Sequence, residues 1–184
     1  MFKSILSFGK RSNQPVVDAL YEAIVASARQ PHFYSQWGVP DTPLGRFEML
    51  SLHMFLFLER ARASGTVLGA LAQEVTDEFF KDIDHSLREL GINDVSMPKR
   101  MKKLARMFYG RAEAYRAALA EGDAAALAAA LARNIRPDEP GWADAPLLAA
   151  YVGHASAALA DQDDAALLAG RIAFADAAGV EAKP

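Results

Sequence analysis

The sequence contains no cysteine, and its glycines are scattered singly. The first absence excludes disulfides, thiolate metal sites and cysteine nucleophiles. The second excludes a glycine-rich phosphate loop, and no nucleophile-elbow pattern occurs either. Long apolar runs are missing too: the richest, residues 49–58, would span about 15 Å as a helix, half of a bilayer core. The sequence therefore predicts no transmembrane segment and no recognisable catalytic motif.

The charge balance is slightly negative, at -3 over 184 residues, which gives no global attraction to nucleic acid. We therefore expect no nucleic-acid partner. The 52% hydrophobic content excludes a disordered chain, and the length fits one domain. We expect a flexible N-terminal segment at residues 1–14 and a single domain over residues 15–184.

Helical periodicity dominates the sequence, and no segment alternates as a strand would. The expected helices cover residues 15–29, 46–63, 66–90, 98–121, 123–134, 147–160 and 164–177. We therefore expect an all-α fold, a compact bundle of about six to eight helices. The connection at residues 30–45 carries three prolines and the aromatic residues Phe33, Tyr34 and Trp37. We expect it to be an ordered, aromatic-rich loop after the first helix.

The helix at residues 46–63 is apolar on every face. Such a helix is either central in the core or partly exposed as a binding surface, and we favour the core. Just before it, Asp41 and Thr42 can bond their own backbone, and Gly45 permits a close approach of another segment. This junction is either a structural corner or a recognition surface that includes Asp41 and Arg46.

Two histidines are candidates for chemistry. Asp82 and His85 have the spacing of a di-iron ligand pair, but such a site needs the motif twice and the sequence has it once. His53 lies within the apolar helix, where a hydrogen-bonded packing role is the ordinary interpretation. We expect no metal and no cofactor. The alternative is a helical haem- or metal-binding protein that uses His53, His85 and nearby carboxylates.

One basic cluster interrupts the even charge pattern. It contains Lys99, Arg100, Lys102 and Lys103, followed by Arg106. Its ordinary interpretation is a solvated helix face. The alternative is that it and the N-terminal residues contact an anionic membrane surface.

Three ordered blocks then suggest a family. They are ARQPHFY with GVPDTPLGRFEMLSLH (residues 28–34 and 38–53), DEFFKDIDHSLRELGIND (77–94) and KRMKKLARMFYGRAEAY (99–115). In this order they resemble the ubiquinol–cytochrome c chaperone family, whose members are assembly factors for respiratory complex III. The family-like core covers residues 21–121, and residues 122–178 look like an alanine-rich helical extension.

The resemblance implies a non-enzymatic, all-helical chaperone. It would bind newly made cytochrome b and support assembly of the ubiquinol–cytochrome c reductase complex. Mitochondrial members work with a small partner protein, so a small co-chaperone is a further expected partner. With no cysteine to protect, we expect a cytoplasmic protein, with peripheral contact at the inner membrane as an extension of that prediction.

A client made of membrane helices calls for a groove with apolar side chains and a polar rim. We place it between residues 46–63 and 77–90. The candidate client-binding residues are Asp41, Arg46, Phe47, Leu50, His53, Met54, Asp82, Arg88, Tyr109 and Arg111. The candidate membrane-surface residues are Lys99, Arg100, Lys102 and Lys103.

Overall fold

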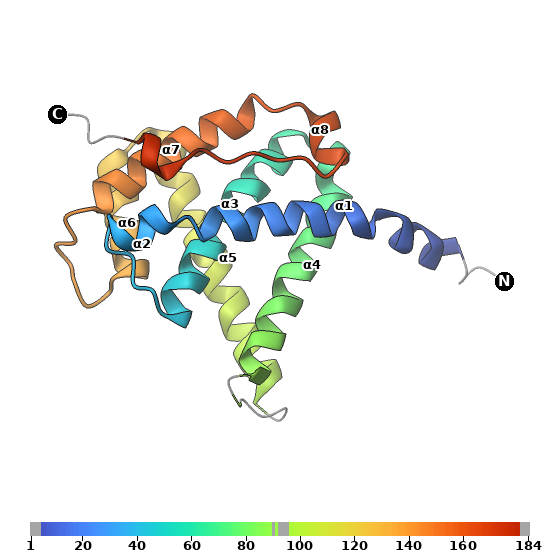
Figure 1. Cartoon of the computed structure of the whole chain (residues 1–184), viewed down its shortest axis with the longest axis horizontal. Coiled ribbons are helices and arrows are strands. Elements are labelled where there is room, and N and C mark those ends of the chain that lie inside the picture. Colours follow the sequence, from blue (N-terminus) through green and yellow to red (C-terminus); the bar gives the residue numbers. More distant parts are fainter. Residues whose placement is uncertain (1–4, 90, 92–95, 181–184) are drawn as a thin grey trace.

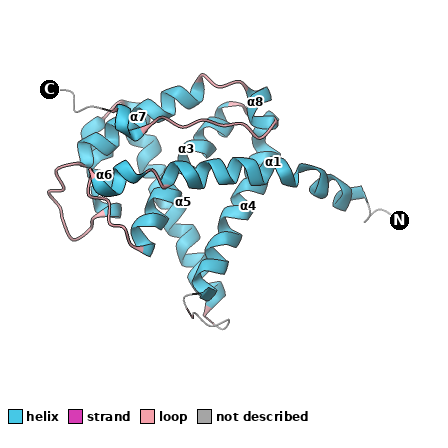
Figure 2. Ribbon diagram, viewed as in Figure 1, coloured by secondary structure: helices cyan, strands magenta, loops and turns pink. Residues whose placement is uncertain are grey.

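The computed structural model describes residues 5–89, 91 and 96–180, and within them it is all-α, with no strand (Figures 1 and 2). The elements are α1 (Ile5–Ala28), α2 (Pro31–Ser35), α3 (Pro43–Ala63), α4 (Thr66–Glu89), α5 (Met97–Glu121), α6 (Ala124–Ile135), α7 (Ala145–Ala160), α8 (Asp164–Leu168) and the short 3-10 helix η1 (Ala177–Gly179). The predicted fold class is confirmed.

Helix α3 is the centre of the molecule. It packs against α1, α4, α5, α6 and α7, and Figure 1 shows it enclosed by these helices. Its apolar residues point in all directions, and every residue from Ser51 to Phe57 is buried. Since burial removes apolar surface from water on every side, this packing explains why the helix needs no polar face. The preference for a central helix is confirmed.

The core has two parts, one on each side of α3. Helices α1 and α4 supply one part, which includes Leu20, Ile24 and Phe79. Helices α6 and α7 supply half of the other, which includes Leu131 and Tyr151. The alanine-rich C-terminal region, expected to be a helical extension, thus contributes directly to the core.

The first helix begins earlier than predicted. Proline often occupies the first helical turn, which placed the start at Pro15. In the structure α1 runs from Ile5 through Pro15, so this start was wrong. A proline inside a helix removes one N–H donor. Contacts on either side of Pro15 hold the helix in place: Val17 is buried, and the Asn13 amide donates to Glu74 (3.4 Å). Residues 5–14 are therefore helical, and residues 1–4 lie outside the described residues.

The connection after α1 contains the single turn of α2. Phe33 and Trp37 are buried against α7, with the Phe33 and Tyr151 ring centroids 4.9 Å apart. The indole N–H of Trp142 donates to the Trp37 carbonyl (2.9 Å). The prediction of an ordered, aromatic-rich segment is confirmed, although residues 31–35 form α2 and residues 43–45 belong to α3.

The last predicted helix, residues 164–177, was wrong beyond its first turn. α8 ends at Leu168, and Gly170 turns the chain with a φ of 76°. Residues 169–180 then form what we call the strap, which runs beside α1 (Figure 1). Two glutamine side chains satisfy its backbone: Gln162 pairs with Ala173 (2.9 and 2.6 Å), and Gln30 binds Ala175 and Ala177 (3.0 and 2.8 Å). The two side chains thus bond four backbone groups of the strap, whose only helical part is the short η1 among the described residues.

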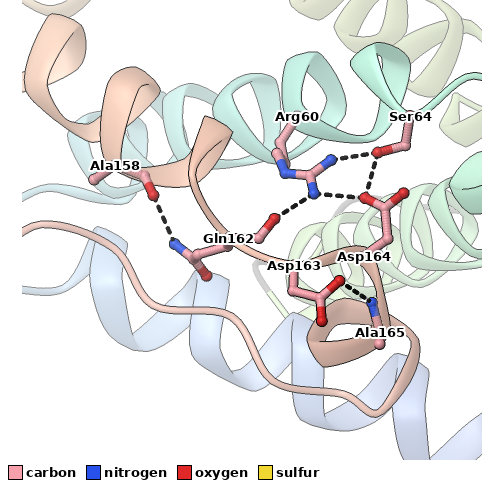
Figure 3. Close-up of polar contacts among 7 residues, drawn as sticks. All are labelled: Arg60, Ser64, Ala158, Gln162, Asp163, Asp164 and Ala165. Atoms are coloured by element: carbon pink, nitrogen blue, oxygen red, sulfur yellow. Dashed lines mark hydrogen bonds and ion pairs between the residues drawn. The ribbon is translucent and has the colours of Figure 1, made fainter.

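A buried arginine fastens α8 to the end of α3 (Figure 3). The Arg60 guanidinium, whose side chain is 7% exposed, donates to Asp164, to Ser64 and to the Gln162 carbonyl. Asp163 caps α8 by accepting from the Ala165 N–H (3.2 Å). Charge-assisted bonds to a buried guanidinium are among the stronger ones in proteins. The cluster therefore fixes the point from which the strap departs.

Candidate binding groove

An open groove of about 720 Å³ lies where α1 ends, α3 begins and the second half of α4 passes over α5. Its apolar surface comes from Val25 of α1, Phe47 and Leu50 of α3, and Ile83 and Leu87 of α4. Phe47 is itself held by Phe79, with the two rings stacked 6.5 Å apart. Such a surface suits an apolar ligand better than a polar one.

One wall of the groove is the junction at residues 41–46. Thr42 caps α3, because its hydroxyl accepts from the Gly45 N–H (3.1 Å), and Pro43 occupies the first turn. Arg46 and Asp41 form an exposed ion pair (2.6 Å). Leu44, 57% exposed, projects at the mouth. The Thr42 cap fits the interpretation of this junction as a structural corner. A recognition surface that includes Asp41 and Arg46 stays a prediction.

Gly45 is where this wall meets the preceding chain. A Cβ built on it would lie 1.9 Å from the Pro40 carbonyl oxygen. The predicted close approach is confirmed. Gly45→Ala is expected to lower the free energy of unfolding by about 2 kcal/mol, since backbone atoms cannot rotate away as a side chain would. Urea denaturation measures this.

The matched controls are Gly69→Ala and Gly110→Ala, in α4 and α5. A Cβ at either position meets nothing within 4 Å. Alanine favours a helix over glycine, so each control should gain about 0.5–1 kcal/mol. Equal losses at all three positions would show that the contact with Pro40 is unimportant.

The opposite wall is the second half of α4, which carries acidic groups. Asp82 accepts a hydrogen bond from the Tyr21 hydroxyl (2.7 Å), and burial together with this carboxylate raises the pKa of Tyr21. Glu89 lies 3.2 Å from the His85 imidazole. The groove thus has an apolar surface between two different walls. One wall carries the Asp41–Arg46 ion pair, and the other carries the carboxylates of Asp82 and Glu89.

Five of the predicted client-binding residues line this groove together: Asp41, Arg46, Phe47, Leu50 and Asp82. The others lie elsewhere. His53 and Met54 are fully buried, Arg88 is exposed on α4 and binds Asp84 (2.6 Å), and Tyr109 is exposed on α5. In this structure, His53 and Met54 present no surface to a partner.

Arg111 lies behind the groove. It binds Glu48 at 2.7 Å, and its guanidinium is 6.0 Å from the centre of the Phe47 ring. The Glu48 side chain is 2% exposed and that of Arg111 12%. Burial raises the pKa of Glu48 to about 7, although the positive charge of Arg111 counteracts the rise. This buried pair supports Phe47, so Arg111 shapes the groove from the inside.

Both ring nitrogens of His53 form hydrogen bonds inside the core. Its Nδ1 lies 2.8 Å from the Met49 carbonyl oxygen, which can only accept, so Nδ1 carries the proton. Its Nε2 then accepts from the Tyr151 hydroxyl (2.8 Å). Burial lowers the pKa of His53 to about 4. A haem or metal bound through Nε2 of His53 would have to displace the Tyr151 hydroxyl, and the described residues hold no group of three or more His, Asp or Glu side chains placed for a metal.

Comparison with known proteins identifies the family. The sequence profile described as "Ubiquinol-cytochrome C chaperone" matches residues 35–174. The chain belongs to this family. The match includes the groove residues from Asp41 to Leu104 and continues past residue 121 through α7 and α8, in keeping with a C-terminal region that contributes to the core.

Two relatives show how far the family likeness extends. A crystal structure of the Cbp3 homolog from Brucella abortus shares 56% identity, covers 98% of this chain and all of its own, and superposes with a TM-score of 0.88. The Xenopus laevis protein "Ubiquinol-cytochrome-c reductase complex assembly factor 1" is 24% identical over 134 residues. That alignment takes in 73% of this chain and 66% of the frog protein.

Several residues that line the groove were not among the predicted client-binding residues. They are Arg29 at the end of α1, Leu44 at the mouth, Leu87 and Glu89 on α4, and Leu104 on α5. Leu87 and Leu104 follow the apolar periodicity of their helices, which predicts burial. Periodicity does not show that both side chains border an open groove.

The basic cluster lies on a different surface of the same chaperone-family fold. Lys99, Lys102, Lys103 and Arg106 follow an i, i+3, i+4, i+7 spacing on α5, and all four are exposed. Buried Phe108 is on the opposite face of the helix. None of the helices in the described ranges is both long and apolar enough to cross a bilayer. A membrane contact at this basic cluster stays a prediction.

Flotation with vesicles of anionic lipid tests that contact. Changing Lys99, Arg100, Lys102 and Lys103 to glutamine should remove most of the bound fraction, because each cation near an anionic surface adds attraction. Lys81→Gln, a cation on α4 that pairs with Glu78, is the control and should change little. Undiminished flotation of the quadruple variant would exclude a membrane contact at the basic cluster.

Proposed function

We propose that this protein is an assembly chaperone for the ubiquinol–cytochrome c reductase complex, and that its groove binds newly synthesised cytochrome b. Family membership supports the first part of the proposal. The apolar groove supports the second, as five residues chosen as client-binding candidates line it together. The proposed action is binding alone, with no chemical step. A small co-chaperone and a cytoplasmic location belong to the same proposal.

The physical basis is the apolar surface of the client. Helices of a membrane protein that are not yet inserted expose apolar side chains to water, which costs about 25 cal/mol per Å². A groove lined by Val25, Leu50, Ile83 and Leu87 can cover part of that surface. An apolar helix enters such a groove by the face formed at i, i+3, i+4 and i+7. Covering this face would keep the client from aggregating until assembly.

Site-specific photocrosslinking in cells that make cytochrome b tests the proposal. A photoreactive residue at Leu44 or Leu87, inside the groove, should capture cytochrome b. The matched control is Val67, also 57% exposed but at the other end of α4. A third probe at Tyr109 shows whether the contact extends along α5. Capture from Val67 alone, or from none of the positions, would refute binding in the groove.

A further inference from the structure

The charged residues that line the groove are Arg29, Asp41, Arg46, Asp82 and Glu89, and their charges are unevenly distributed. On one wall, Asp41 and Arg46 neutralise each other at 2.6 Å. On the other wall, Asp82 receives only the neutral hydroxyl of Tyr21, and Glu89 faces the His85 imidazole. Among the described residues, no lysine or arginine pairs with either of these two carboxylates. The α4 wall therefore offers negative charge that a ligand can use.

The two carboxylates share a face of α4 with apolar residues. Asp82 and Glu89 are seven positions apart, so both point to the same side of the helix, about 11 Å apart along its axis. Ile83 and Leu87 line the groove between them. A ligand that lies along α4 thus meets apolar contacts and a carboxylate within the same two helical turns.

The size of the groove limits what fits. Two helical turns are about 11 Å, whereas a membrane-spanning helix covers about 30 Å of hydrocarbon. The groove, at about 720 Å³, therefore holds one end of such a helix or a short part of it. The ends of membrane helices differ from their middles, because lysine and arginine are concentrated just beyond the apolar span on one side.

We infer that the groove recognises the basic end of a membrane helix: two apolar turns followed by a lysine or arginine that pairs with Asp82 or Glu89. This inference rests on the proposed function, since it assumes a membrane-protein client. Charge complementarity selects this occupant, because an apolar segment without a cation leaves the two carboxylates unused. An acidic segment would be repelled by them.

Synthetic peptides test this inference directly. The probes are fluorescent helical peptides of about 12 residues (some 18 Å), with the same apolar face and either lysine or glutamate at one end. Fluorescence anisotropy at low salt should show about five- to tenfold tighter binding of the lysine peptide. The difference should shrink as salt is added, because exposed charges are screened.

The decisive variant is Asp82→Asn with Glu89→Gln. Asparagine keeps an acceptor for the Tyr21 hydroxyl, so the fold should be retained, and the preference for lysine should fall to less than about twofold. The control is Glu74→Gln with Asp77→Asn, the same charge change on α4 outside the groove. It should keep the preference. As a second variant, Glu89→Lys should favour the glutamate peptide.

The outcomes separate this inference from the proposed function. Equal binding of both peptides overturns the charge selection, even if cytochrome b still crosslinks at Leu44 and Leu87. Loss of the preference in the control variant also overturns it, because net charge alone would then explain the binding. If neither groove position captures cytochrome b, the proposed function falls first and this inference with it.

Discussion

Replacing Arg111 by methionine is expected to lower the free energy of unfolding by about 3–5 kcal/mol at pH 8, as measured by urea denaturation. The reason is the carboxylate of Glu48, 2% exposed and 2.7 Å from the guanidinium. Without Arg111 that charge would be buried alone. The support behind Phe47 is lost as well, so groove crosslinking should weaken.

The loss should depend on pH. Burial already raises the pKa of Glu48 to about 7, and removing the positive charge raises it further. At pH 5 the folded variant therefore holds Glu48 in its neutral form. At higher pH, Glu48 ionises in the unfolded chain but not in the folded variant, and this difference favours unfolding. The deficit relative to the unmodified protein should therefore be smaller at pH 5 than at pH 8.

The matched control is the double variant Glu48→Met with Arg111→Met. Replacing both partners of a buried pair by apolar side chains removes the unpaired charge, so most of the stability should return. A double variant as unstable as the single one, or a deficit equal at both pH values, would contradict this explanation.

His53 is expected to make the protein lose stability in acid. Burial lowers its pKa to about 4 from an ordinary 6.5, so in this range the unfolded chain binds a proton that the folded chain does not. The free energy of unfolding should therefore fall as the pH falls from 6.5 to 4, by up to about 3 kcal/mol. His53→Gln should remove this contribution, which urea denaturation at several pH values measures as a flatter slope.

Two comparisons isolate the effect of His53. Between pH 4.5 and about 7, Glu48 changes the free energy of unfolding in the opposite direction, because burial raises its pKa. Glu48 is present in both the unmodified protein and His53→Gln, so its contribution cancels in the difference between them. Tyr151→Phe removes the hydrogen bond to Nε2 and should cost about 1 kcal/mol at pH 7 while keeping the acid slope. An unchanged slope in His53→Gln would show that His53 takes up its proton without cost.

The sequence predicted the middle of the fold well. The bounds of α3, α4 and α5 were expected within three residues, because helical periodicity marks their length and Pro98 lies in the first turn of α5. Leu90, the expected last residue of α4, lies outside the described residues. The strap was missed because Gln30 is 147 residues from the Ala177 N–H that it binds, and Gln162 is 11 residues from Ala173, beyond the three- and four-residue steps of a helix. Local periodicity contains no sign of such bonds.

The groove was predicted in part, for a related reason. Phe47, Leu50 and Asp82 were chosen with the correct pair of helices, since residue spacing fixes which side chains share a face. His53 and Met54 were included because α3 is apolar on every side, and no pattern then distinguishes the covered faces from the open one. α7 covers His53, as the bond to Tyr151 shows.

The strap and Gln30 together constrain how this protein can be made. Gln30 leaves the ribosome early, yet the backbone groups it binds belong to Ala175 and Ala177, about 145 residues later. A shorter separation, 98 residues, lies between His53 and its partner Tyr151. During synthesis from the N-terminus, α1 and α3 must therefore wait for the last part of the chain. The chaperone consequently passes through a stage in which its own central helix is as poorly covered as the client it is proposed to protect.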